Sequence, residues 1–163
     1  MKFNFYALRA IYLHEMDRFR RTLLQSLLSP VLSTSLYFIV FGSVIGDYVE
    51  TIDGLSYGSY IVPGLLMLTL LTQSISNTSF GIFFPKFNGT IYEILAAPIS
   101  TFEVVLAFVG AGATKTLIVG IVIFITSLFF VDVTVKYPLL MIFLLVLVAF
   151  TFALFGFLIG LMS

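Results

Sequence analysis

The feature that most constrains this chain is a set of long apolar runs, each able to cross a lipid bilayer. Residues 22–46 contain no charged side chain, and at about 1.5 Å rise per residue a helix of that length exceeds the roughly 30 Å hydrocarbon core. Three more apolar runs follow at 58–84, 104–131 and 139–162. Because lipid offers no hydrogen bonds, a spanning segment must satisfy its own backbone groups, and a helix does so. The sequence predicts an all-α integral membrane protein with four transmembrane helices.

The composition agrees with a membrane protein and excludes several other classes. Of the 163 residues, 60% are hydrophobic and 10% are charged, against roughly 25% charged in a soluble domain. Eight basic residues match eight acidic ones, so there is no basic field to hold a nucleic-acid backbone. The chain has no cysteine and a single histidine, His14, and its carboxylates are scattered over separate loops. We therefore expect no metal site, no catalytic residue and no nucleic-acid partner.

The first 21 residues have an amphipathic pattern. Apolar side chains recur at spacings of three and four residues. The charged side chains, Glu15 among them, are assigned to the rest of the helix circumference. The apolar positions are Phe5, Leu8, Tyr12, Met16 and Phe19. This pattern predicts an interfacial helix on the membrane surface over residues 1–21. The alternative is a basic anchor that simply flanks the first span.

A second amphipathic segment lies in the polar connector between the second and third spans. Residues 86–97 place Phe87, Ile91, Ile94 and Leu95 opposite polar side chains, and Pro98 ends the pattern. The other two connectors, 47–57 and 132–138, are short and polar.

Basic residues near the ends of the spans predict the orientation. Six lie in the amino-terminal segment and the 85–103 connector, and only Lys136 lies on the other side. The six are Lys2, Arg9, Arg18, Arg20, Arg21 and Lys86. Because basic residues favour the cytoplasmic side, we expect a cytoplasmic amino terminus with segment 86–97 on the same side.

Proline and glycine positions predict local features of the spans. Pro30 should bend the first span, and Pro63-Gly64 should interrupt the second near its start. Two G-x-x-x-G pairs, Gly42 with Gly46 and Gly156 with Gly160, favour close helix packing.

Lys115 falls inside the third apolar run. A charge at the bilayer centre costs at least about 2.5–3.5 kcal/mol, so its position needs an explanation. It could lie in the first turn of the span and extend back to the headgroups, or it could be a buried functional charge. Residues 110–116, GAGATKT, faintly resemble a phosphate-binding loop but lack the glycine before the lysine and a surrounding sheet. Small residues for helix packing are the better interpretation.

A polar stripe follows one side of the second span. Its members recur at three and four residues; they are Thr69, Thr72, Gln73, Ser76 and Asn77. Such a stripe must face protein or water, so it could line a transport path or form interhelical hydrogen bonds.

Segments outside the spans are too short for a catalytic domain. None exceeds about 21 residues, fewer than a nucleotide-binding fold needs. We therefore expect no enzymatic activity in this chain. Any chemical energy must come from another protein, and segment 86–97 is a suitable docking element for it.

Several ordered motifs over about 100 residues resemble one family. The amino-terminal arginines precede Pro30 and Phe41-Gly42 in the first span. Residues 60–64, YIVPG, open the second span, and the most specific run is 86–100, KFNGTIYEILAAPIS. Together they resemble the amino-terminal two-thirds of a permease subunit of the bacterial type-2 ATP-binding-cassette (ABC) exporters.

The resemblance implies a six-span domain in the inner membrane, paired with a second copy, a homodimer being expected, and with two cytoplasmic ATPase subunits. ATP and Mg²⁺ would be bound by those partners. Segment 86–97 would be the coupling helix, with six residues in the ATPase groove: Phe87, Ile91, Tyr92, Glu93, Ile94 and Leu95. Since the chain ends at Ser163 after four spans, we expect an incomplete version of the domain.

Three functions remain open at this point. The first is the transmembrane subunit of an ATP-driven exporter, whose substrate the sequence does not identify. The second is a small membrane scaffold or assembly protein without transport. The third, a secondary transporter, is disfavoured because such proteins place coupled charges or broken helices at the midplane, and Lys115 is the sole candidate.

Overall fold

The computed structural model describes residues 4–41, 57–132 and 135–163, and every regular element in these ranges is helical. The helices are α1 (Phe5–Arg21), α2 (Leu23–Ile39), α3 (Tyr57–Phe87), α4 (Ile91–Ala96), α5 (Thr101–Phe130) and α6 (Pro138–Met162). The predicted all-α class is confirmed. The glycine pair at the end of the first span and almost all of the acidic 47–57 connector lie outside the described residues.

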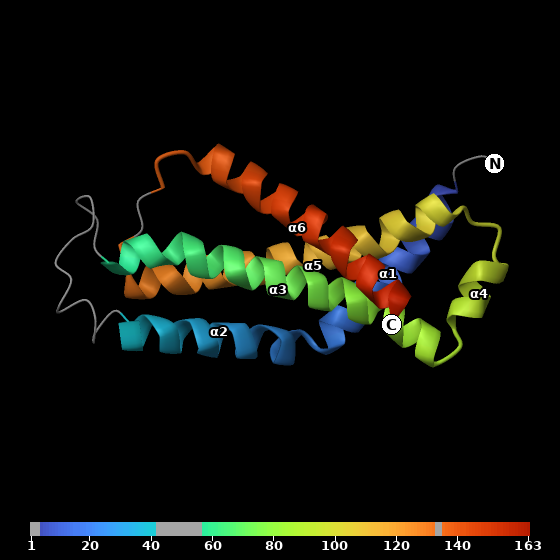
Figure 1. Ribbon diagram of the computed structural model, residues 1–163, viewed down its shortest axis with the longest axis horizontal. Coiled ribbons are helices and arrows are strands. Elements are labelled where there is room, and N and C mark those ends of the chain that lie inside the picture. Colours follow the sequence, from blue (N-terminus) through green and yellow to red (C-terminus); the bar gives the residue numbers. More distant parts are fainter. Residues whose placement is uncertain (1–3, 42–56, 133–134) are drawn as a thin grey trace.

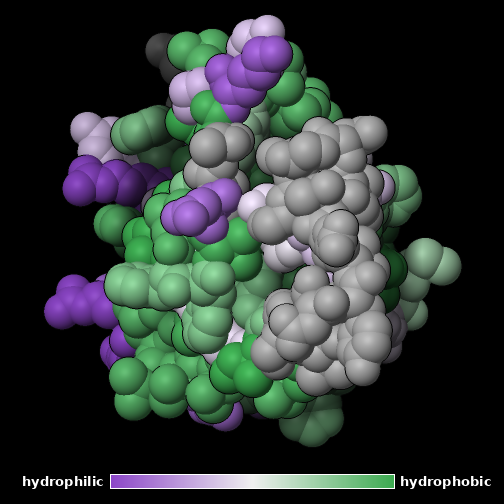
Figure 2. Space-filling model, turned by 90° about the vertical axis from the view of Figure 1, so that its left-hand side faces the viewer, coloured by the Kyte–Doolittle hydropathy of each residue, from purple (hydrophilic) through white to green (hydrophobic). Residues whose placement is uncertain are grey.

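Three of these helices are long and apolar enough to cross a membrane, namely α3, α5 and α6. Helices α1 and α2 together make a fourth candidate, bent by 64° at the break between them. The termini and α4 lie toward one end of the bundle, and the α5–α6 connection lies at the other (Figure 1). From that other end, hydrophobic side chains cover most of the described surface (Figure 2). A surface of this kind suits lipid rather than water.

The bend after α1 has a local cause in the sequence. The Thr22 backbone N–H donates to the carbonyls of Arg18 and Phe19, and its hydroxyl donates to the same two carbonyls. These bonds satisfy the last turn of α1, so the chain can change direction before α2 begins. At the other end of α1, the Asn4 side chain accepts from the Ala7 N–H and caps the helix.

Helix α5 is the centre of the bundle. It packs against α1, α2, α3 and α6, and 56% of its most apolar window is buried, against 22% for α3 and for α6. Helix α3 lies between α5 and α6, whereas α2 packs mainly on α5 (Figure 1). Every other long helix therefore contacts α5, and the most extensive contact in the bundle joins α3 to α6.

Glycines allow α3 to approach both neighbours closely. A Cβ on Gly156 of α6 would lie 2.5 Å from the Ile75 carbonyl oxygen, and one on Gly160 would lie 2.7 Å from that of Ser79. On α5, a Cβ on Gly112 would overlap the Thr78 side chain. The predicted packing role of the Gly156–Gly160 pair is confirmed. The Ser74 hydroxyl adds an interhelical bond of 2.6 Å to the Ala149 carbonyl of α6.

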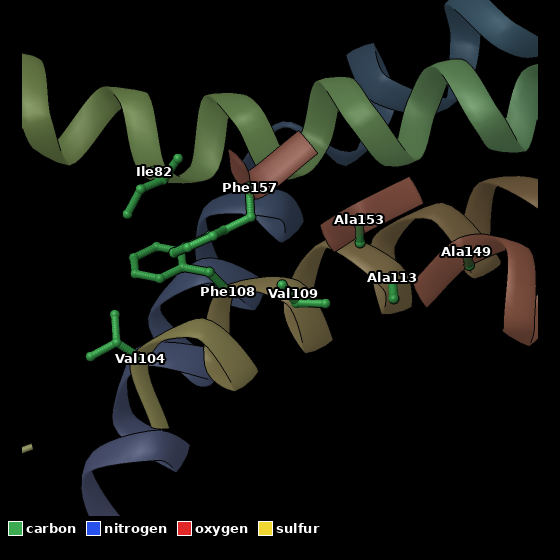
Figure 3. Close-up of a cluster of buried hydrophobic side chains, with 8 residues drawn as sticks. All are labelled: Ile82, Val104, Phe108, Val109, Ala113, Ala149, Ala153 and Phe157. Carbon is green, nitrogen blue, oxygen red and sulfur yellow. The ribbon is translucent and has the colours of Figure 1, made fainter. Parts of the chain in front are cut away.

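The hydrophobic core lies where α3, α5 and α6 meet, toward the α4 end. Eight buried side chains form it: Ile82, Val104, Phe108, Val109, Ala113, Ala149, Ala153 and Phe157 (Figure 3). The rings of Phe108 and Phe157 lie 6.3 Å apart at a tilted angle, an arrangement that aromatic pairs favour.

The predicted interruption at Pro63-Gly64 is wrong, because α3 continues through Pro63. Pro63 is close to the start of the helix, so its missing N–H removes a single intrahelical bond within two turns of the end. That cost is small compared with the packing of α3 against α5 and α6.

Replacing Gly160 by valine should lower the free energy of unfolding by about 1–3 kcal/mol, because the new side chain meets the α3 backbone. Gly64→Val is the matched control, since no atom lies within 4 Å of a Cβ at Gly64. Thermal unfolding of the purified protein in detergent measures the difference. Equal midpoints for the two variants would contradict the glycine packing described here.

Candidate functional site

The predicted coupling segment consists of the end of one helix and the whole of another. Lys86 and Phe87 form the last turn of α3, and α4 covers only Ile91–Ala96, so a single helix over residues 86–97 is wrong. The turn between them needs Gly89, whose φ is 78°, a region that other residues adopt at a cost. The Gly89 N–H donates to the Lys86 carbonyl and starts this turn.

The six predicted ATPase-contacting residues lie together at this end, but they face two ways. Phe87, Tyr92 and Leu95 are 77%, 73% and 68% exposed, and Glu93 is also exposed. In contrast, Ile91 and Ile94 are half-buried and pack against the hydrophobic core. The isoleucines therefore attach α4 to the bundle. We call the three exposed apolar residues, Phe87, Tyr92 and Leu95, the outer knob.

A capping box holds the chain after α4. The Ser100 hydroxyl accepts from the Glu103 N–H at 3.3 Å, and the Glu103 carboxylate accepts from the Ser100 N–H at 2.8 Å. The same carboxylate accepts from the Asn4 N–H. The start of α5 is thus joined to the start of α1. The signal for this cap, Ser followed three residues later by Glu, is present in the sequence, although the apolar and polar patterns alone do not reveal it.

Lys86 joins the end of α3 to the end of α6. Its Nζ donates to the carbonyls of Leu161 at 2.7 Å and Gly160 at 3.4 Å. A cation at a helix carboxyl terminus interacts favourably with unpaired carbonyls and with the helix dipole. The connector that carries the outer knob is therefore attached to α1, α5 and α6 as well as to α3.

Lys115 is a buried charge and does not extend to the headgroups. Its side-chain nitrogen lies 2.7 Å from the Glu15 carboxylate, and the two residues are 4% and 2% exposed. The Arg18 guanidinium approaches the same carboxylate oxygen at 3.0 Å. The headgroup interpretation is wrong. We call Glu15, Lys115 and Arg18 the charge cluster; it joins α1 to the middle of α5.

The amphipathic pattern predicts Glu15 on the charged side of the first helix, yet its carboxylate faces α5. It lies seven residues after Leu8 and four before Phe19, so it shares the packed face of α1 with them. A carboxylate on an apolar face and a lysine in an apolar span are the two signals that could have identified the pair.

The polar stripe of α3 faces away from α5 and α6 over most of its length. The hydroxyls of Thr69 and Thr72 bond to backbone carbonyls one turn back in α3. Gln73 is partly exposed and Ser76 is exposed, so the described helices leave this side of α3 largely uncovered. Asn77 alone reaches another helix, through its amide and the Thr116 hydroxyl at 3.5 Å. Interhelical hydrogen bonding therefore explains one end of the stripe.

The GAGATKT run is a helical segment of α5, with Ala111 and Ala113 fully buried. The packing interpretation of these small residues is confirmed. Within the described ranges, no three His, Cys, Asp or Glu side chains gather in a group that could hold a metal ion.

These features place the chain in a defined class: a multi-pass membrane protein of the ABC-2 type transporter family, to which it belongs over residues 6–163. It is 40% identical over 154 residues to the inner membrane transport permease YadH of Escherichia coli K12. The same identity is found with YadH of Escherichia coli O157:H7 and of Shigella flexneri. The alignment covers 94% of this chain and 60% of each relative. No solved structure matches the chain.

Replacing Lys115 by methionine should lower the free energy of unfolding by about 3–5 kcal/mol, because it leaves the Glu15 carboxylate buried without its closest cation. Adding Glu15→Gln to this variant should restore most of the loss, since the uncompensated charge is then removed. Thermal unfolding in detergent measures both. Lys136→Met, at an exposed lysine, is the control and should change little. A double variant no more stable than Lys115→Met would contradict the pairing.

Proposed function

We propose that this chain is the transmembrane permease subunit of an ATP-driven exporter in the bacterial inner membrane, and that a separate cytoplasmic ABC ATPase docks on the outer knob. Membership of the ABC-2 type transporter family supports the class, and the YadH relatives are transport permeases by name. The observation that carries the docking proposal is the exposure of Phe87, Tyr92 and Leu95 on a connector that is otherwise held firmly. Exposed aromatic and aliphatic side chains on a short rigid element are typical anchors for a partner's groove.

The contacts of the connector explain how a movement of the ATPase would reach the spans. A displacement of α4 acts on α3 through the Gly89 turn and on the core through Ile91 and Ile94. Lys86 transmits it to α6, and Glu103 to α1. Closure of two ATPase subunits on ATP would thereby move several helices together, as rigid-body transitions require. The ATPase subunits bind ATP and Mg²⁺ and perform the hydrolysis.

The charge distribution supports a cytoplasmic position for the amino terminus and α4. Arg18, Arg20 and Arg21 belong to α1, and Lys86 lies next to α4, whereas Lys136 belongs to the connection at the opposite end of the bundle. An excess of basic residues at one end is the pattern of a cytoplasmic face. This orientation puts the outer knob where a soluble ATPase can reach it.

A second copy of the chain would complete the transport path. The exposed side of α3 carries Thr72, Gln73 and Ser76 near the middle of a 31-residue helix. Polar side chains at that position are costly against lipid and favourable against water or another subunit. We infer that the polar stripe lines the path at the contact with a homodimer partner. The chain spans about 60% of the length of its YadH relatives, and transport by the whole assembly is part of this proposal.

Replacing Leu95 by aspartate should weaken ATPase binding about 30-fold or more, because it removes an exposed anchor and places a charge in an apolar groove. Co-purification of the ABC ATPase that associates with the unaltered chain measures the effect. Leu139→Asp is the matched control, since Leu139 is also exposed, at 84% against 68% for Leu95, but lies at the start of α6, at the other end of the bundle. Equal recovery of the ATPase with both variants would refute docking on the outer knob.

A further inference from the structure

An open groove runs along α2 from the bend that follows α1. It has a volume of about 650 Å³ and is lined by Arg21, Thr22, Leu24, Gln25, Leu28, Ser29, Leu32 and Ser33. All eight residues are exposed. They lie on a different side of α2 from Pro30, Thr34 and Phe38, which are buried, with the Phe38 ring stacked on Phe130 of α5. The helices of the described chain thus leave the groove uncovered.

Positive charge gathers at the α1 end of the groove. A second, polar hollow of about 300 Å³ is lined by Asp17, Arg20 and Arg21, so the two hollows share Arg21. In the described part of the chain, the ion pairs of Glu15 engage Lys115 and Arg18, and neither Arg20 nor Arg21 is in an ion pair. Two guanidinium groups and one carboxylate leave one net positive charge there. This end of the groove is suited to an anion.

The length of the groove matches one leaflet of a bilayer. Leu24 and Ser33, the first and last residues of α2 that line the groove, are nine residues apart, or about 14 Å along the helix, close to the roughly 15 Å that is half of a hydrocarbon core. Arg21 is the last residue of α1, two residues before the apolar α2 begins, and therefore lies near the headgroups. Leu24, Leu28 and Leu32 are spaced four residues apart, which makes one continuous apolar row.

We propose that the groove and the polar hollow beside it together bind one anionic phospholipid, with its phosphate at Arg20 and Arg21 and one acyl chain along Leu24, Leu28 and Leu32. Gln25, one turn deeper than Arg21, can donate to an ester carbonyl of the lipid. The site is separate from the outer knob, and it depends neither on ATPase docking nor on which side of the membrane α1 faces.

The apolar row distinguishes a phospholipid from a free phosphate ion, which would gain nothing from the leucines. The net positive charge distinguishes an anionic from a zwitterionic lipid, whose own ammonium group opposes the arginines. Asp17 weakens the site by repelling the phosphate. Removing this carboxylate should therefore strengthen lipid binding, a gain that a misfolded variant could not show.

The test compares the purified full chain in mixed phosphatidylglycerol and phosphatidylethanolamine of identical acyl chains, with retained lipid counted by native mass spectrometry. The unaltered chain should retain phosphatidylglycerol preferentially. Arg20→Gln and Arg21→Gln should each reduce that preference about fivefold, the effect of one basic residue near an anionic surface. Asp17→Asn should raise it. Arg9→Gln, at an exposed arginine of α1 remote from the groove, is the matched control and should leave it unchanged.

Three results would overturn the proposal. The first is an unchanged phosphatidylglycerol preference in the Arg20→Gln, Arg21→Gln double variant that melts at the same temperature as Arg9→Gln. The second is displacement of the lipid by millimolar inorganic phosphate, which would indicate an anion site only. The third is a dimer whose contact covers Leu28 and excludes lipid, shown by a disulfide between two copies of a Leu28→Cys variant.

Discussion

The charge cluster of Glu15, Lys115 and Arg18 is the interaction on which the arrangement of α1 against the rest of the bundle depends. It joins residues 100 apart in the sequence and fixes α1 across α5, the most deeply buried of the long helices. A buried pair of this kind adds little net stability, because desolvation offsets the attraction, but losing either partner is costly. Its effect is therefore to allow one position of α1 on α5 and to penalise all others.

The rest of the structure combines closely packed helices with one exposed apolar surface. Glycines on α5 and α6 allow α3 to pack closely against both helices. The connector after α3 is attached on its inner side by Ile91 and Ile94. It exposes the outer knob on its other side. A short element that is packed in this way can transmit a displacement to the helices it contacts, whereas a loosely attached loop would change its own conformation instead.

Much of this organisation could be predicted from the sequence, because long charge-free runs leave a chain few alternatives to membrane helices. The single helix over residues 86–97 failed for a local reason, the turn at Gly89, and the other details that failed depend on which helices meet. Pro63 was expected to break α3, but packing on two neighbours outweighs one lost hydrogen bond. The role of Lys115 was ambiguous because its partner, Glu15, lies on another helix. No local sequence pattern predicts where α1 crosses α5. Likewise, five apolar residues in a six-residue helix do not reveal that Ile91 and Ile94 face inward.

The most direct test of the central claim is photo-crosslinking in intact cells from a benzoyl-phenylalanine placed at Tyr92, with the same probe at Tyr137 as the control. Both tyrosines are exposed, at 73% and 65%, but they lie at opposite ends of the bundle. The account predicts a crosslink to an ABC ATPase from position 92 and none from position 137. A crosslink to the ATPase from position 137, or none from 92 in cells where the ATPase co-purifies with the chain, would contradict it.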